Sequence, residues 1–109
     1  MRKAEVRYDN KLAGYLIQNE NGYEFTYDEK YYNSEKTKSI SVTLPKTQKS
    51  FNSKYLFPFF DGLIPEGWLL DIAEKNWKLN PRDRMGLLLV CCKDCIGAIS
   101  IHYSGDINE

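Results

Sequence analysis

The chain has 109 residues, a mass near 12.7 kDa, and fifteen basic residues that balance fifteen acidic ones. This length fits one domain and excludes a whole protein kinase, a doubly wound dehydrogenase or a (β/α)8 barrel. A formal net charge of zero gives the chain no general attraction to nucleic acid. The hydrophobic fraction of 42%, with eight Tyr, five Phe and two Trp, is enough for a packed core and too high for a disordered chain.

The N-terminal sequence has charges but no apolar stretch after them, so it does not resemble a secretory signal. The longest apolar run, Met85–Cys92, is far shorter than the ~20 residues that span a bilayer. Three cysteines without an export signal are typical of reduced thiols. The sequence therefore predicts a cytoplasmic protein with no membrane partner.

The first half of the chain predicts strands. Val6–Tyr8 and Leu12–Ile17 flank a tight turn at Asp9-Asn10-Lys11. Asn21-Gly22 favours a type I′ hairpin turn, because both residues tolerate a positive φ. The following strand, Tyr23–Tyr27, alternates aromatic with polar residues.

Asp28 is expected to cap a short helical turn that ends at Tyr32. Further along, Ile40–Leu44 alternates apolar with hydroxyl side chains, which predicts a fourth strand that Pro45 ends.

Helical patterns dominate the second half. A short helix is expected between Pro58 and Pro65, and the next begins at Pro65 or Glu66 and ends near Lys75. Asn80 as cap and Pro81 at the first helical position predict a helix to about Val90. The elements expected here are Phe59–Leu63, residues 65–75, residues 81–90 and a last strand, Gly97–Tyr103. The predicted class is α+β, with a small, mainly antiparallel sheet of N-terminal strands plus a C-terminal strand, packed with two to three short helices in a single domain over 1–109.

Charge is segregated along the chain although it sums to zero. Lys36 to Lys54 contains five lysines and no acid, whereas Asp61 to Glu74 contains four acids and no base. These segments fit either a solvated loop and a solvated helix face, or a two-signed docking surface for a protein of complementary pattern. Contact with DNA is disfavoured, because the basic segment lacks arginine and the features of a recognition helix.

Few residues of the sequence are candidates for metal binding or catalysis. Cys92 and Cys95 have the spacing of half a zinc site, with Cys91 and His102 nearby, but the second half is missing. The cysteines are interpreted as small buried hydrophobes, and His102 is expected on the wetter face of the last strand.

Two short segments look like kinase motifs, but both fail. Pro81-Arg82-Asp83 resembles a kinase catalytic loop, yet Leu88 stands where the metal-binding Asn is needed. Phe60-Asp61-Gly62 is only a rearranged Asp-Phe-Gly, and no glycine-rich phosphate loop precedes a strand lysine. Asp83 is better interpreted as a first-turn helix acid. The sequence predicts no catalytic residue, no metal site and no cofactor, so we expect a protein that is not an enzyme.

The helix that carries Trp68 is the most informative one. At ~100° per residue, its apolar residues form one arc, with Trp68 at the edge beside Asp71 and Lys75. Trp68 also directly follows Pro65-Glu66-Gly67. A tryptophan in such a place is either a residue at the margin of the core or an anchor of a protein interface, where tryptophan is enriched.

Four motifs in order resemble those of the HipA N-terminal subdomain. Residues 59–67 (F-F-D-G-L-I-P-E-G) are similar to the signature F-F-x-x-L-L-P-E-G, and residues 39–45 (S-I-S-V-T-L-P) to the strand L-S-x-S-L-P. Residues 25–28 (F-T-Y-D) match F-x-Y-D, and residues 94–98 (D-C-I-G-A) match D-C-x-G-A. The resemblance covers about residues 4–103, nearly the whole chain.

The resemblance implies a partner. HipA-like toxins are serine/threonine kinases whose nucleotide and catalytic residues lie downstream of this subdomain, and none of those residues is present here. The chain is similar to the small component of three-gene, HipBST-type modules, in which the separated small protein is an antitoxin of a shortened kinase. The resemblance therefore implies binding and neutralisation of a HipA-like kinase. Our hypothesis from the position of Trp68 is that residues 65–68 dock near the active site of the kinase, and the charge pattern predicts no direct nucleic-acid contact. An alternative is a non-inhibitory accessory subunit that completes the kinase or bridges it to a DNA-binding repressor. The expected partner-binding residues are Pro65, Glu66, Gly67, Trp68 and Asp71.

Overall fold

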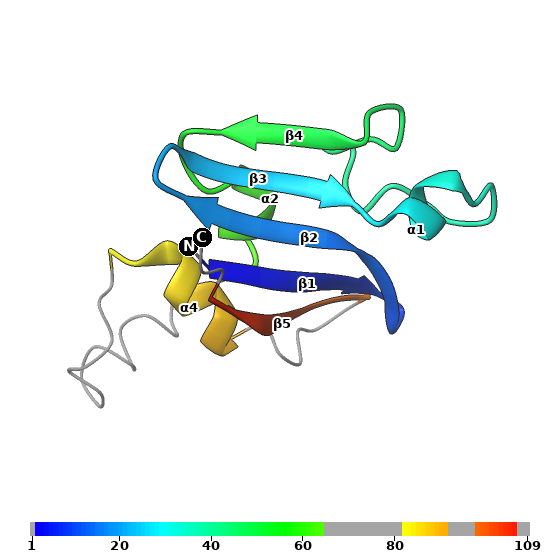
Figure 1. Cartoon of the computed structure of the whole chain (residues 1–109). Coiled ribbons are helices and arrows are strands. Elements are labelled where there is room, and N and C mark those ends of the chain that lie inside the picture. The colour runs from blue at the N-terminus through cyan, green and yellow to red at the C-terminus, as the bar shows by residue number, and fades with distance from the viewer. Residues whose placement is uncertain (1, 65–81, 92–97, 107–109) are drawn as a thin grey trace.

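The computed structural model describes residues 2–64, 82–91 and 98–106 of the chain. Five strands form one antiparallel sheet in the order β4-β3-β2-β1-β5, so the C-terminal strand β5 pairs with the N-terminal strand β1. Within the described residues three short helices accompany it, which confirms the predicted α+β class (Figure 1). The elements are β1 (Arg2–Tyr8), β2 (Lys11–Asn19), β3 (Gly22–Tyr27), α1 (Glu29–Asn33), β4 (Ser50–Ser53), α2 (Pro58–Asp61), α4 (Arg84–Cys91) and β5 (Ile99–Asp106).

The two N-terminal hairpins differ in their turns. Asp9 and Asn10 both have positive φ, 50° and 65°, so the predicted turn between β1 and β2 has the φ signature of type I′. The second hairpin was predicted at the right place but with the wrong turn. Asn19 pairs with Gly22 across it, and of the two expected residues only Gly22 has a positive φ, 136°. Glycine is required at this position by its φ and by the Ser53 carbonyl oxygen, which would lie 2.3 Å from a Cβ atom.

The predicted strand at Ile40–Leu44 is wrong. Its two ends are buried, but Val42 is 95% exposed and the segment is a turn closed by a single bridge between Ser41 and Leu44. The strand that pairs with β3 on the side away from β2 is β4, at Ser50–Ser53. The physical reason is that the hydroxyl of Tyr27 accepts a hydrogen bond from the Ile40 N–H at 3.0 Å and donates one to the Leu44 carbonyl oxygen. The backbone groups at both ends of the segment are therefore satisfied without a neighbouring strand.

The helices partly follow the predictions. In α1, Asp28 occupies the N-cap position but its side chain makes no capping hydrogen bond. In α2 the expected segment begins at Pro58 and ends at Asp61. The structure begins α4 at Arg84 rather than at Pro81, and the predicted cap Asn80 lies outside the described residues. The helix predicted at residues 65–75 also lies outside them.

The core lies between one face of the sheet and the helices. Phe60 of α2 is fully buried against Phe25 of β3, with 5.7 Å between ring centroids, and α2 lies behind the strands in Figure 1. Met85 and Leu88 of α4 belong to the same cluster, so both helices cover the same face. Full burial of each such side chain contributes about 1.5–3 kcal/mol. The other described members include Ala4, Val6, Ala13, Leu16, Tyr27, Leu87 and Ile101.

Candidate interaction surface

The predicted contact residues Pro65, Glu66, Gly67, Trp68 and Asp71 lie outside the described residues, so their contacts stay predictions. The structure does describe both ends of the segment that holds them. It leaves the described part after Ile64, which is buried with 4% of its surface exposed, and returns at Arg82. The surface around these two ends is therefore the part of the candidate site that the structure defines.

One ion pair joins the two helices at this surface. The Nε atom of Arg84, at the start of α4, donates to Oδ1 of Asp61, at the end of α2, at 2.6 Å. Both side chains are about one third exposed or more, so the pair contributes only about 0–1 kcal/mol. Its structural effect is to hold together the helix ends from which residues 65–81 depart and return. Asp61, the first acid of the predicted acidic segment, is thus engaged by its own chain.

A second ion pair fixes the start of α4 to the sheet. The guanidinium of Arg2 in β1 donates to both carboxylate oxygens of Asp83, at 2.6 and 3.0 Å, and its Nε donates to Gln18 at 2.7 Å. Oδ1 of Asp83 also accepts from the Gly86 N–H at 3.1 Å, as an N-cap residue does. The sequence analysis placed Asp83 in the first turn of the helix, but α4 begins at Arg84 and no acid lies in its first turn; Asp83 precedes that turn and acts as its cap.

These contacts change the pKa values of both residues in the direction that favours their charged forms. The hydrogen bonds from Arg2 lower the pKa of the Asp83 carboxyl, with desolvation opposing them and the Gly86 N–H adding to them. The same hydrogen bonds raise the pKa of Arg2 above its usual range. Both residues therefore stay charged at neutral pH, and the pair keeps its bidentate geometry.

An apolar groove lies beside this ion pair. It is lined by Arg2, Gly86, Leu89, Val90 and Tyr103 and has a volume of about 470 Å³. Val90 and Tyr103 are about half exposed, at 52% and 48%. The sequence analysis named these two residues only as the ends of predicted elements and did not identify this surface. A projection of α4 would have found Val90, because it lies about 200° around the helix from the buried Leu88.

The lysine-rich segment does not form one continuous basic surface. Lys46 is used internally, since its Nζ atom donates to the carbonyl oxygens of Ser34 and Thr37 at 2.6 and 3.1 Å. Lys36 and Lys38 are exposed and line a pocket together with Lys11, which the sequence analysis did not associate with them. The remaining two, Lys49 and Lys54, are exposed and line no part of that pocket.

The described residues give no sign of a metal centre or a membrane segment. Among them, no group of three His, Cys, Asp or Glu side chains could hold a metal ion, whereas Cys92 and Cys95 lie outside the described ranges. His102 is half-buried and its Nε2 lies 2.9 Å from the Ser100 hydroxyl, on the strand face opposite the buried Ile101, as predicted. No helix within the described ranges combines the length and the apolar character needed to cross a bilayer.

Known proteins resemble this chain along most of its length. It is 29% identical over 101 residues to an uncharacterized protein of Haemophilus influenzae, covering 93% of this chain and 92% of the relative. It is 28% identical to the Sinorhizobium fredii protein named "Putative kinase Y4mE", of which it spans only 24%. The solved structure "N-terminal domain of HipA toxin" has the same fold, with a TM-score of 0.77, 24% identity, and coverage of 98% of this chain and 96% of that one.

The family profile of the HipA N-terminal domain matches residues 4–102. This range extends from the first buried residue of β1 to the middle of β5, so it contains the whole described core. The chain therefore belongs to the HipA N-terminal domain family.

Proposed function

We propose that this chain is a binding subunit, not an enzyme, and that it docks onto a HipA-like serine/threonine kinase and neutralises it as an antitoxin. The observation that carries the proposal is the family match over residues 4–102, which covers nearly the whole chain. In the kinase-named relative, the matching region is only about a quarter of the protein. A domain that belongs beside a kinase has a surface suited to that kinase. We propose that this chain uses such a surface to regulate the kinase.

The segment proposed for contact is residues 65–71, which contains Trp68. It follows Ile64, which is buried three residues after the end of α2, and the ion pair between Asp61 and Arg84 joins the two helices that flank residues 65–81 in the chain. A segment anchored at both ends loses less conformational entropy on binding than a free tail. We propose that it hinders substrate access or a productive closure of the kinase.

A second function is favoured by the kinase-named relative, in which this domain is about a quarter of a longer protein. Here the chain is an accessory subunit that completes the kinase or bridges it to a DNA-binding repressor, without inhibiting it. Both functions require kinase binding, and they differ only in what binding does to activity.

Coexpression with the partner kinase separates these functions. An antitoxin restores growth of cells in which the kinase is induced and lowers autophosphorylation of the purified kinase in proportion to complex formed. An accessory subunit binds the kinase with the same stoichiometry but leaves growth arrested and autophosphorylation unchanged or raised. Absence of a complex in size-exclusion chromatography would refute both.

A further inference from the structure

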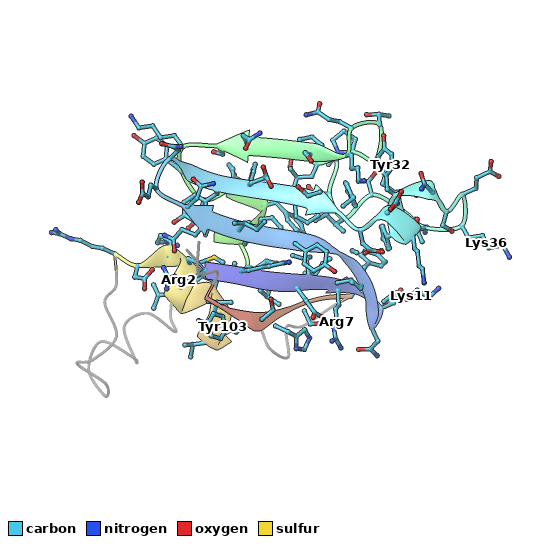
Figure 2. The ribbon with its side chains drawn as sticks, in the orientation of Figure 1. Arg2, Arg7, Lys11, Tyr32, Lys36 and Tyr103 are labelled. Carbon is cyan, nitrogen blue, oxygen red and sulfur yellow. The ribbon has the colours of Figure 1, made fainter. Side chains whose placement is uncertain are left out.

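A basic pocket lies at the end of the sheet remote from α4. It has a volume of about 140 Å³ and lies between the turn that joins β1 to β2 and the loop that follows α1. Lys11 comes from the first of these segments, and Lys36 and Lys38 from the second. Figure 2 shows Lys11 and Lys36 at this same end of the molecule, with Arg2 and Tyr103 at the other. The pocket is therefore separate from the surface discussed for kinase contact.

Hydrogen bonds fix the backbone that carries Lys36 and Lys38. The Tyr31 hydroxyl, at the rear of the pocket, donates to the Lys38 carbonyl oxygen at 2.5 Å, and the Thr37 hydroxyl donates to the Tyr31 carbonyl oxygen at 2.6 Å. The ammonium of Lys46 contacts Thr37 from the other side, at 2.5 Å from Oγ1. Tyr31 is only 4% exposed, so this anchor is buried. The two lysines thus project from a backbone that is already ordered before any ligand arrives.

Hydrogen bonds also fix the other wall of the pocket, which is the turn between β1 and β2. Asp9 and Asn10 form the tight turn, and the Asp9 N–H donates to the Ala98 carbonyl oxygen at 2.8 Å. Lys11 follows directly and pairs with Tyr8 across the hairpin. Within the described part of the chain, none of the three lysines of the pocket forms an ion pair. Against their three positive charges, the pocket contains a single carboxylate, that of Asp9.

We propose that this pocket is a docking site for a short acidic segment of a partner protein, with one Asp or Glu side chain entering between Lys11, Lys36 and Lys38. An adjoining hollow, which shares Lys11, Tyr31 and Thr37 with the pocket, is lined by Asp28, Glu29 and Lys30. There Asp28 and Glu29 offset the charges of Lys11 and Lys30, so the hollow offers no net attraction to further carboxylates and the surface favours one or two carboxylates followed by neutral residues. A protein is favoured over nucleic acid because the pocket has no arginine and its Tyr31 ring is buried, which leaves the half-buried Tyr8 as the one aromatic side chain of the lining on which a base could stack.

Two double variants, each of which loses two positive charges, test the proposal. Lys36→Gln with Lys38→Gln removes two charges from the pocket, and Lys49→Gln with Lys54→Gln removes two charges from exposed positions outside it. The probe is a peptide with a central Glu-Glu pair flanked by Gly and Ser, titrated into the full isotope-labelled chain and followed by amide shifts in NMR. Exposed charge pairs of this kind each change affinity by roughly two- to fivefold.

The expected result is saturable shifts at residues 9–11 and 36–38, an affinity about fivefold lower in the pocket variant, and less than twofold lower in the control. Asp9→Asn is expected to raise the affinity about twofold, since it removes the one opposing charge. Equal losses in both double variants, equal binding of a Gln-Gln peptide, absence of shifts at these amides, or tighter binding of a single-stranded oligonucleotide there would overturn the proposal. Because no kinase is present in the titration, its failure is distinct from failure of the antitoxin function.

Discussion

At the scale of single residues, the hydroxyl of Tyr27 takes the place of a strand partner for the segment between Ile40 and Leu44. It accepts from the Ile40 N–H and donates to the Leu44 carbonyl oxygen, and its ring is 1% exposed. Tyr27→Phe keeps the ring but leaves both backbone groups without this partner in a buried place. We expect the free energy of unfolding to fall by about 2–3 kcal/mol, measured by denaturant titration. Tyr55→Phe, at a ring 73% exposed, serves as control and is expected to change it by less than ~0.5 kcal/mol; equal effects of the two variants would contradict the assignment.

Tyr31 gives a prediction about pH. Burial, with smaller contributions from Tyr27, Tyr8 and Asp9, raises the pKa of Tyr31 to about 12. Its pKa in the unfolded chain is about 10, so the folded state holds the phenolic proton more tightly. The stability that Tyr31 contributes is therefore complete below pH ~10 and is lost as the pH rises from about 10 towards 12.

Denaturant unfolding between pH 8 and 11.5 checks this prediction. Burial also raises the pKa values of Tyr23 and Tyr27, so some loss of stability above pH ~10 is expected in any variant. In Tyr31→Phe the decline should be shallower than in the unaltered chain, although the variant is less stable at pH 8 because the hydrogen bond to Lys38 is missing. Parallel declines in the two proteins would show that Tyr31 does not titrate as described.

At the scale of elements, the start of α4 depends on Asp83. Its carboxylate caps the helix through the Gly86 N–H and pairs with Arg2 of β1. Asp83→Ala removes both contacts and is expected to lower the free energy of unfolding by about 1–2 kcal/mol. Asp83→Asn keeps a capping oxygen and loses only the charge of a partly exposed pair, so its cost should be about half as large or less. The same chemical denaturation measures both, and equal costs would mean that the cap contributes nothing.

The elements also show how far a sequence determines such a fold. The two hairpins, the helix after Phe57 and the last strand follow from local signals, namely turn residues, proline positions and alternation of apolar side chains. The strand expected at residues 40–44 failed because its alternation reports only that Ile40 and Leu44 are buried. Tertiary contacts decide whether a neighbouring strand or the Tyr27 hydroxyl forms hydrogen bonds with the backbone of this segment. β4, Ser-Phe-Asn-Ser, carries almost no apolar signal, and in the described sheet it is a short edge strand that pairs with β3.

Surfaces were harder to predict than strands. Lys11 and Lys36 are distant in sequence and share a pocket only because the β1–β2 turn reaches the loop after α1. Similarly, Tyr103 and Val90 come from different elements and meet beside Arg2. No periodicity links such pairs, so composition could indicate a basic segment but could not tell that Lys46 is internal while Lys36 and Lys38 face outward.

At the scale of the whole molecule, the proposed function depends on Trp68. We expect Trp68→Ala to weaken kinase binding by about 2–4 kcal/mol, the usual cost of truncating an interface anchor, with the thermal unfolding of the free domain unchanged. Isothermal titration with the purified kinase measures this change. Trp77→Ala is the control. If the helical projection is carried two residues past Lys75, Trp77 lies among the apolar residues of the arc, next to Leu70, so its loss should lower stability more than affinity. Unaltered neutralisation by Trp68→Ala would refute the docking mechanism.

The strand order has a consequence for how the protein is made. Among the five described strands, β1 leaves the ribosome first but is an inner strand, with β2 on one side and β5 on the other. β2 follows almost at once, whereas β5 is synthesised about ninety residues after β1, which corresponds to roughly 5–20 s of translation. During that interval one edge of β1 has no native neighbour from its own chain. A nascent domain of this family is therefore open to strand pairing with another chain, and a chaperone or the cognate partner that covered this edge during synthesis would raise the yield of folded protein.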